Sequence, residues 1–185
     1  VPEKYVLMLG LEMLNGLRVA HDKGITHRDI KPANILIHSE MGVKISDFGL
    51  AKLKDADNGL TREGVFIGTP SFSSPEQIEG RPIDRRSDLF SLGLTLYMLA
   101  TGTHAFKQKG DSTTTVWFKI VRGKFQAVRD IDPSLSPDFE RILSRSLQVD
   151  LDKRYQSAKE MADDVLALLK KRKSYPYQDE LKAFL

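Results

Sequence analysis

The first stretch of the chain carries an apolar stripe at the spacing of an α-helix. Apolar residues that recur at three- and four-residue intervals indicate one buried helical face. Pro2 suits the first helical turn, and Gly24 suits the position just after a helix C-terminus. We therefore expect a well-buried helix between these two residues. Its stripe consists of Val6, Leu9, Met13, Leu17 and Ala20, widened by Leu7, Leu11 and Leu14.

Residues 85–100 differ, because they are apolar almost all round. A helix with apolar side chains on every side belongs at the centre of a domain. Gly102 suits its end. Asp88, near its start, is the polar exception, although a carboxylate is also favourable close to a helix N-terminus. The apolar members are Leu89, Phe90, Leu92, Leu94, Leu96, Tyr97, Met98 and Leu99.

Further along the chain, cap residues and apolar spacing predict shorter helices. We expect them at 113–122, ended by Gly123; from Ser136-Pro137-Asp138 to about Leu147; after a capping box at Ser157–Glu160, with Met161, Val165 and Leu168 buried; and as a short helix or tail at 175–185.

Two short strands interrupt this helical pattern. Ile35-Leu36-Ile37 and Val43-Lys44-Ile45 are rich in β-branched residues, and residues 38–42 between them favour a hairpin. Such a hairpin would place Asn34 and Asp47 at neighbouring strand ends. The fold class is therefore α+β and mainly α, with a helical bundle around one central buried helix.

Composition narrows the classes of protein only slightly. The 185 residues are 41% hydrophobic and 29% charged, which is typical of a globular domain. A net charge of +3 is too small to argue for nucleic acid. The absence of cysteine excludes disulfides and thiolate metal sites and fits a reducing compartment. The start of the chain lacks a signal-peptide pattern, and the most apolar run, Leu89–Ala100, is too short to cross a bilayer.

Residues 25–37 gather the candidate chemistry. Asp29, Lys31 and Asn34 lie within six residues, and Asp47 follows in the sequence Asp47-Phe48-Gly49. A carboxylate can accept the proton of a hydroxyl nucleophile, and a lysine can neutralise phosphate charge as a point charge. An amide oxygen and a second carboxylate are hard ligands suited to Mg²⁺. This set fits Mg²⁺-assisted phosphoryl transfer.

Three motifs in this order resemble the bacterial type of the eukaryotic-like (Hanks-type) serine/threonine protein kinases. They are the catalytic-loop pattern His27, Arg28, Asp29, Lys31 and Asn34; Asp47-Phe48-Gly49; and Ser74-Pro75-Glu76, with Ser where the family more often has Ala. Lys31 is typical of the serine/threonine subclass. The resemblance implies a catalytic loop at 25–37, a metal loop at 47–49 and an activation segment at 47–76.

The resemblance also implies a role for each site residue. Asp29 would be the catalytic base, Lys31 would contact the γ-phosphate of ATP, and Asn34 and Asp47 would hold Mg²⁺, with Mn²⁺ as an alternative. Among the supporting positions, His27 would pack on Phe48, Leu36 would form the floor under adenine, and Asp88 would accept hydrogen bonds from the catalytic-loop backbone. Glu76 would pair with Arg154, although Leu151 replaces the usual Pro of the motif that contains Arg154. Gly68-Thr69-Pro70 would position the substrate. For Leu36, plain core packing is an equal alternative.

The resemblance implies regulation within the activation segment as well. Arg28 would receive a phosphate there. Thr61, in the middle of the segment, is our expected regulatory phosphosite, whereas Thr69 has a structural role in the family. An ordinary exposed loop threonine is an equal alternative for Thr61.

The resemblance covers only the C-terminal two-thirds of the family's domain. Residues 1–185 contain no Gly-x-Gly-x-x-Gly loop, no Val-Ala-x-Lys strand and no hinge for adenine. We therefore expect a kinase C-lobe without its N-lobe, inactive in isolation. Its partners would be ATP, the N-lobe and a protein with Ser or Thr, with no nucleic acid and no membrane segment in this chain. Its location would be cytoplasmic, or the cytosolic part of a larger membrane-anchored kinase.

Two other functions are compatible with parts of this pattern. A non-catalytic truncated C-lobe that serves as a docking module would explain the missing N-lobe, but each catalytic position of the C-lobe is filled. A small-molecule phosphotransferase of the aminoglycoside or choline type shares the Asp–Asn–Asp arrangement. Those sites lack a lysine two residues after the catalytic Asp and lack the Ser-Pro-Glu segment.

Overall fold

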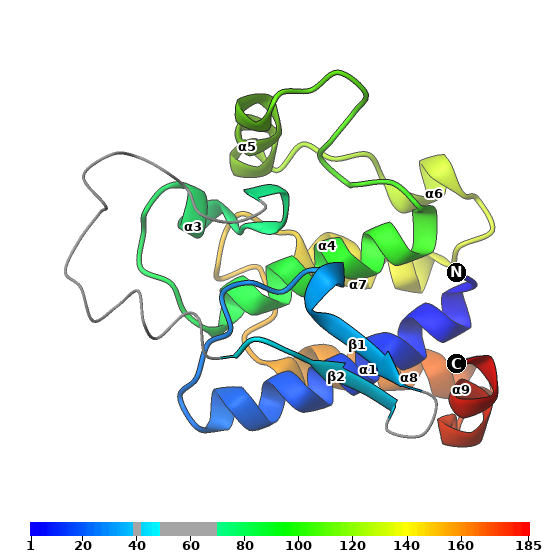
Figure 1. Ribbon diagram of the computed structural model, residues 1–185. Helices are drawn as coiled ribbons and strands as arrows, with labels where there is room; N and C mark the ends of the chain where they lie inside the picture. The colour runs from blue at the N-terminus through cyan, green and yellow to red at the C-terminus, as the bar shows by residue number, and fades with distance from the viewer. Residues whose placement is uncertain (39–41, 49–69) are drawn as a thin grey trace.

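A computed structural model of the chain describes residues 1–38, 42–48 and 70–185 (Figure 1). The expectations for Gly49, Thr61 and the 68–69 part of the substrate platform lie outside these residues. The described part is mainly helical, with a two-stranded antiparallel sheet against α1.

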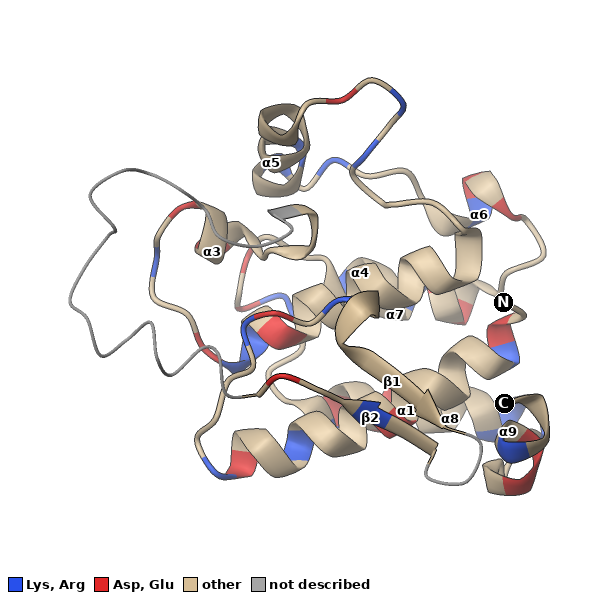
Figure 2. Ribbon diagram, in the orientation of Figure 1, with Lys and Arg blue, Asp and Glu red and all other residues tan. Residues whose placement is uncertain are grey.

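Two long helices form the centre of the core. Helix α1 runs Glu3–Asp22 and helix α4 runs Arg85–Thr101, as their apolar patterns predict. Asp84 caps the start of α4 by accepting from the backbone N–H of Arg86, and Gly102 ends it in a left-handed conformation with φ 71°. Figure 2 shows that α4 carries its charged residues only in its first turn. Burial stops earlier than expected, because Met98 in the last turn is 37% exposed.

Other helices surround this pair. Helix α8 (Ala158–Lys171) packs along α1, and α7 (Pro137–Ser146) contacts both α4 and α8. The contact between α4 and α7 requires a glycine, because a Cβ built at Gly93 would lie 2.1 Å from Ser146 Oγ. The C-terminal α9 (Gln178–Phe184) rests on α1, and α5 (Thr113–Arg122) begins at the cap residue Ser112.

Short helices that the sequence analysis did not anticipate join these elements. They are α3 (Pro75–Ile78), α6 (Val128–Ile131) and the 3₁₀ turns η1 (Pro32–Asn34) and η2 (Pro70–Phe72). The capping box predicted at Ser157 is also only half correct. Ser157 caps α8 through the backbone N–H of Glu160, but the Glu160 carboxylate accepts from the backbone N–H of Gln156, one residue earlier.

The predicted hairpin is present, with each strand one residue longer than expected. Strand β1 (Ile35–His38) pairs with β2 (Gly42–Ile45) so that Ile35 faces Ile45 and His38 faces Gly42. The hairpin lies along α1, where the Ile45 side chain reaches Gly16: a Cβ built at this glycine would make an ordinary van der Waals contact with Ile45 at 3.9 Å. No helix within the described residues combines the length and apolarity that a membrane span needs.

Candidate active site

The candidate base Asp29 lies in the loop between α1 and η1 and is held by its own neighbours. Its carboxylate accepts from Lys31 Nζ at 2.8 Å and from Asn34 Nδ2 at 3.1 Å. Asn34 Nδ2 also donates to the Asp29 backbone carbonyl at 2.8 Å. The Asp29 side chain remains 48% exposed, so that a hydroxyl group has access to the carboxylate.

The metal-loop carboxylate of Asp47 reaches the same end of the hairpin. The backbone N–H of Ser46 donates to the Asn34 carbonyl at 2.9 Å, which joins the end of β2 to the start of β1. Ser46 Oγ donates to Asp47 Oδ2 at 3.0 Å. Asp47 has a positive φ of 64°, a conformation that is costly for residues other than glycine and common at functional sites.

The donor set fits a hard divalent cation. The Asn34 amide nitrogen donates to Asp29, which leaves the side-chain carbonyl oxygen available to bind a metal ion. That oxygen and the Asp47 carboxylate are the ligand types that Mg²⁺ prefers. Within the described residues no cluster of three or more His, Cys, Asp and Glu side chains exists that could hold a metal by itself. A cation here would therefore draw its other ligands from water or phosphate oxygens.

His27 links the two loops and has no free nitrogen for catalysis. Its ring meets the Phe48 ring edge-on, with centroids 4.6 Å apart. The backbone N–H of Asp29 donates to His27 Nδ1 at 3.2 Å, so Nε2 carries the proton and donates to the Ser46 carbonyl at 2.7 Å. Because both ring nitrogens are hydrogen-bonded, the role of His27 is to hold the two loops together.

Asp88, in the first turn of α4, fixes the catalytic-loop backbone through hydrogen bonds. The backbone N–H groups of His27 and Arg28 donate to its two oxygens, each at 2.8 Å. This side chain is 1% exposed, so the interactions are shielded from water. Arg28 has a positive φ of 69°, and the two bonds hold the loop in this strained turn.

A further partner of Asp88, His21, was missed by the sequence analysis. His21 Nε2 lies 2.8 Å from Asp88 Oδ2, and its side chain is 4% exposed. Its Nδ1 is buried without a hydrogen-bond partner. The signal was present in the sequence: His21 follows Leu14 and Leu17 at helical spacing, so a polar side chain on this buried face required a partner.

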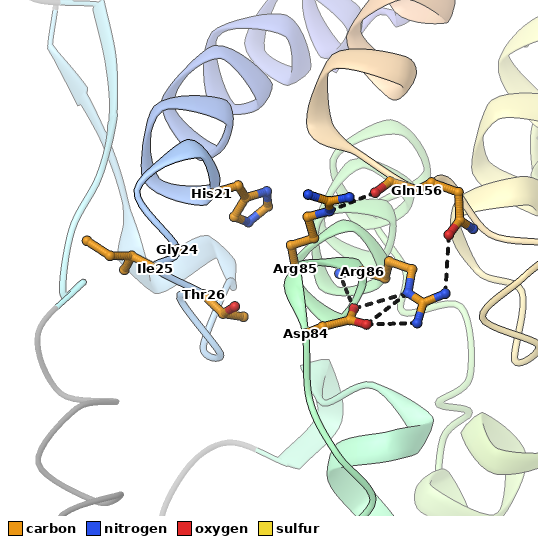
Figure 3. A pocket seen from close by; sticks show the side chains of 8 residues that line it. All are labelled: His21, Gly24, Ile25, Thr26, Asp84, Arg85, Arg86 and Gln156. Carbon is orange, nitrogen blue, oxygen red and sulfur yellow. Dashed lines mark hydrogen bonds and ion pairs between the residues drawn. The ribbon is translucent and has the colours of Figure 1, made fainter.

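His21 also lines a cavity of about 380 Å³ between the end of α1, residues 24–26 and the start of α4. Figure 3 shows the His21 ring facing Arg85 across this space, with Thr26 and Asp84 below them in the view. None of Asp29, Asn34 and Asp47 lines it. The cavity is therefore separate from the proposed nucleotide and metal site.

The expected ion pair between Glu76 and Arg154 forms in the interior. Arg154 donates from Nη1 to Oε1 at 2.8 Å and from Nη2 to Oε2 at 3.2 Å, and both residues are 0% exposed. Ser87 Oγ donates to the same carboxylate at 2.5 Å. Burial alone would raise the pKa of the Glu76 carboxyl, but the hydrogen bonds and charge of Arg154 outweigh it and hold the pKa below the ordinary value of 4.5.

Gln77, beside Glu76, connects α3 to the catalytic loop and was also missed. Its Oε1 accepts from the backbone N–H of Ser74, completing a capping box at the start of α3. Its Nε2 donates to the Arg28 carbonyl at 2.7 Å. Helix α3 therefore contacts the catalytic loop directly, through the residue that follows the Ser-Pro-Glu segment.

Leu36 lies on the surface of the hairpin. It is 55% exposed and the neighbouring Ile37 is 53% exposed. This exposure overturns the alternative that Leu36 packs in the core of this chain. The apolar surface it presents is compatible with the role under adenine, which stays a prediction.

Comparisons of the sequence with known proteins match it to bacterial kinases. The family model of the protein kinase domain matches residues 1–166. A probable serine/threonine-protein kinase of Streptomyces coelicolor is 41% identical over 170 residues, covering 91% of this chain and 25% of the relative. The serine/threonine-protein kinase PknB of Mycolicibacterium smegmatis is 39% identical over 151 residues, 81% of this chain and 24% of the relative. A probable serine/threonine-protein kinase of Clostridium perfringens is 35% identical over 165 residues, 89% of this chain and 24% of the relative. The chain thus spans about a quarter of the length of these relatives.

Proposed function

The chain belongs to the protein kinase family, and on that premise we propose that it carries the C-lobe part of the catalytic site of a serine/threonine protein kinase. The reaction is transfer of the γ-phosphate of ATP to a Ser or Thr hydroxyl of a protein. The observation that carries the proposal is the joint fixing of Asp29, Lys31 and Asn34 by direct hydrogen bonds, on a backbone that Asp88 holds.

Each residue has a distinct part in this proposal. Asp29 orients the substrate hydroxyl and takes its proton as the new bond from oxygen to phosphorus forms. Lys31, 15% exposed beside Asp29, neutralises charge on the transferring phosphate. Asn34 and Asp47 would hold Mg²⁺, or Mn²⁺ in its place. When bound, the cation neutralises phosphate charge and orients the nucleotide.

In this proposal, the groups that position the nucleotide phosphates come from an N-lobe outside residues 1–185. The Gly-rich loop and the lysine of an N-lobe, absent from residues 1–185, would position the phosphates. We expect residues 1–185 alone to phosphorylate at a rate lower by roughly 10³ or more, because positioning dominates this chemistry. The protein substrate and a cytoplasmic location belong to the same proposal.

A transfer assay on the full-length protein tests it. With radiolabelled ATP, Mg²⁺ and a Ser/Thr protein substrate, the wild type should incorporate phosphate, and Asp29→Asn should lose this activity. Asp22→Asn, an exposed carboxylate at the end of α1, is the matched control and should retain activity. An inactive full-length wild type would favour the docking-module alternative instead.

A further inference from the structure

The cavity that His21 lines has no part in the catalytic proposal. It is bounded by the end of α1, residues 24–26, the start of α4 and Gln156 in the loop before α8, and we refer to it as the His21 cavity. Its volume of about 380 Å³ lies toward the lower end of the roughly 300–1,000 Å³ that small-molecule sites occupy. The cavity therefore has the size of a site for a small chemical group.

One ring nitrogen of His21 lacks a partner inside this part of the protein. The side chain is 4% exposed, and its Nε2 lies 2.8 Å from Asp88 Oδ2, so Nε2 carries a proton that the carboxylate accepts. Among the described residues, nothing forms a hydrogen bond with Nδ1, although this atom is buried. Leaving a buried polar atom unpaired is unfavourable, and such an atom needs an explanation. Because the ring faces the cavity (Figure 3), a ligand there can supply the missing partner.

The charges around the cavity determine the sign of that ligand. Arg85 lies across the cavity from the His21 ring (Figure 3), and its Nε donates to the Gln156 carbonyl at 2.9 Å, which leaves both terminal amino groups of the guanidinium for a ligand. No carboxylate of the described residues forms an ion pair with Arg85. Asp84, the one carboxylate in the described lining, is paired with Arg86 at 2.7 Å. The cavity therefore holds uncompensated positive charge, which favours an anion and disfavours a cation.

The backbone and a hydroxyl group add to this preference. Helix α4, which has 17 residues, begins with Arg85 at the wall of the cavity, so the positive end of its dipole lies there. Thr26 also belongs to the lining and carries a hydroxyl group that can donate a hydrogen bond. A guanidinium, an imidazole and a hydroxyl are donors of the kind that bind a phosphate group, whose several oxygens can accept from all three.

We propose that the His21 cavity binds a phosphate group. In the occupied site Arg85 pairs with the phosphate, and His21 is an imidazolium that donates from Nε2 to Asp88 and from Nδ1 to a phosphate oxygen. A cation would face the unpaired Arg85, and an apolar ligand would leave Nδ1 without a partner. The proposal does not rest on the kinase function, because none of the candidate catalytic residues lines the cavity. The phosphate group belongs either to a free anion or to a phosphorylated side chain.

Isothermal titration calorimetry of the full-length protein tests the site. The probe is inorganic phosphate, added without nucleotide or Mg²⁺, and sodium chloride of equal ionic strength is the blank. Saturable binding is expected, with a Kd on the order of 1 mM or tighter. Sulfate should compete with phosphate, because it presents the same tetrahedral set of acceptor oxygens. Absence of any phosphate binding beyond the chloride blank would overturn the proposal.

Matched variants assign the binding to this cavity. Arg85→Gln removes an exposed charge, and His21→Gln removes the second donor of the ring, so each should weaken phosphate binding about tenfold. The controls are Arg141→Gln on α7, where the side chain is 59% exposed, and His38→Gln at the exposed end of β1. Both should bind phosphate as the wild type does. Unchanged binding in Arg85→Gln and His21→Gln would place the phosphate elsewhere and overturn the proposal.

A variant of opposite sign separates binding from loss of structure. Asp84→Asn keeps a good helix cap but removes the carboxylate from the lining, so phosphate should bind more tightly, by about threefold. Misfolding cannot produce a gain of affinity, and weaker binding by Asp84→Asn would overturn the proposal.

Two further probes distinguish the sources of the phosphate group. They are a short phosphoserine peptide and its unphosphorylated counterpart, each titrated into wild type and Arg85→Gln. Tighter binding of the phosphopeptide than of inorganic phosphate, with loss in Arg85→Gln, would support the site with a phosphorylated side chain as its ligand. Binding of inorganic phosphate alone, with the same loss, would support it with a free anion as its ligand. Equal binding of the two peptides, without measurable binding of inorganic phosphate, would overturn the proposal.

Discussion

Arg154 and Glu76 lie 78 residues apart in the sequence and form a buried two-point ion pair. The guanidinium also donates to the Gln148 carbonyl at 2.8 Å and to the Arg86 carbonyl at 3.0 Å. One side chain therefore joins α3, the start of α4 and the loop before α8. The Ser-Pro-Glu segment is anchored to the helical core through this residue.

Arg154→Leu should destabilise the fold by about 3–5 kcal/mol, because the Glu76 carboxylate would be left buried and unpaired. Urea denaturation at neutral pH measures this difference. Lys159→Ala is the control, since the Lys159–Asp163 pair is 66% and 61% exposed and should contribute less than about 1 kcal/mol. An unchanged midpoint for Arg154→Leu would contradict the energetic importance of the pair.

The same carboxylate predicts a dependence of stability on pH. The folded-state pKa of Glu76 is below its ordinary value of 4.5, so the folded state favours the ionised form. Its contribution is complete above about pH 4.5 and is lost as the pH falls through the folded-state pKa. The stability difference between wild type and Glu76→Gln should therefore be large at pH 7 and should shrink below about pH 4.5. Denaturation curves at several pH values check this, and a difference that widens on acidification would have the wrong sign.

Asp88→Asn should lower kcat by on the order of tenfold to a hundredfold in the full-length protein. An amide presents only one oxygen, so the N–H group of either His27 or Arg28 loses its acceptor and the catalytic loop shifts. His21→Ala should have a smaller effect in the same direction, because it removes a partner of Asp88 without touching the loop. Asp84→Asn is the control, since asparagine caps a helix as well as aspartate does. Equal activity of Asp88→Asn and wild type would contradict the role of Asp88.

Asp47→Ala and Asp29→Asn should separate nucleotide binding from transfer. Asp47→Ala would remove a proposed metal ligand and should weaken binding of Mg²⁺-ATP to the full-length protein. In the proposed roles Asp29 contacts the hydroxyl nucleophile and not the nucleotide, so Asp29→Asn should bind Mg²⁺-ATP almost as the wild type does while transferring no phosphate. Isothermal titration calorimetry with Mg²⁺-ATP distinguishes the two. Equal losses of affinity would contradict this division of roles.

Thr61 is predicted to carry the main regulatory phosphate, which would contact Arg28 through charge-assisted hydrogen bonds. Phosphopeptide mapping of the active full-length protein should find Thr61 modified, and Thr61→Ala should lower activity while Thr69 remains unmodified. A stoichiometric phosphate elsewhere in residues 47–76 with Thr61 unmodified would rule the prediction out.

The long helices and the hairpin were predictable because their patterns are local. Helices α1 and α4 each present several turns of apolar spacing, and Gly102 and Gly123 end α4 and α5 where the sequence indicates. The four-residue helices α3 and α6 were missed, because a single turn is too short to show a period. Glu160 was misassigned because a flexible carboxylate can accept from either of two adjacent backbone N–H groups.

In the candidate site, too, contacts between neighbours in the sequence were predictable and contacts between distant residues were not. Asp29, Lys31 and Asn34 are neighbours in sequence, so their association could be predicted. The contacts of His21 with Asp88 and of Gln77 with Arg28 join residues 67 and 49 positions apart. The helical spacing of His21 indicates that this side chain needs a partner, but no local pattern identifies the partner in either pair. The partners become visible only when packing has brought α1, α3 and α4 together.

The pairing of Ile35 with Ile45 fixes the register of the hairpin. Asn34 precedes the first paired residue and Asp47 follows shortly after the last one, so this register also fixes where the two residues lie relative to each other. Because side chains alternate between the two faces of a strand, one residue added within either strand would turn the following side chains to the opposite face. Substitutions of the exposed side chains of the hairpin should therefore be tolerated, whereas a change in strand length should not. Insertions should be tolerated only outside the paired residues.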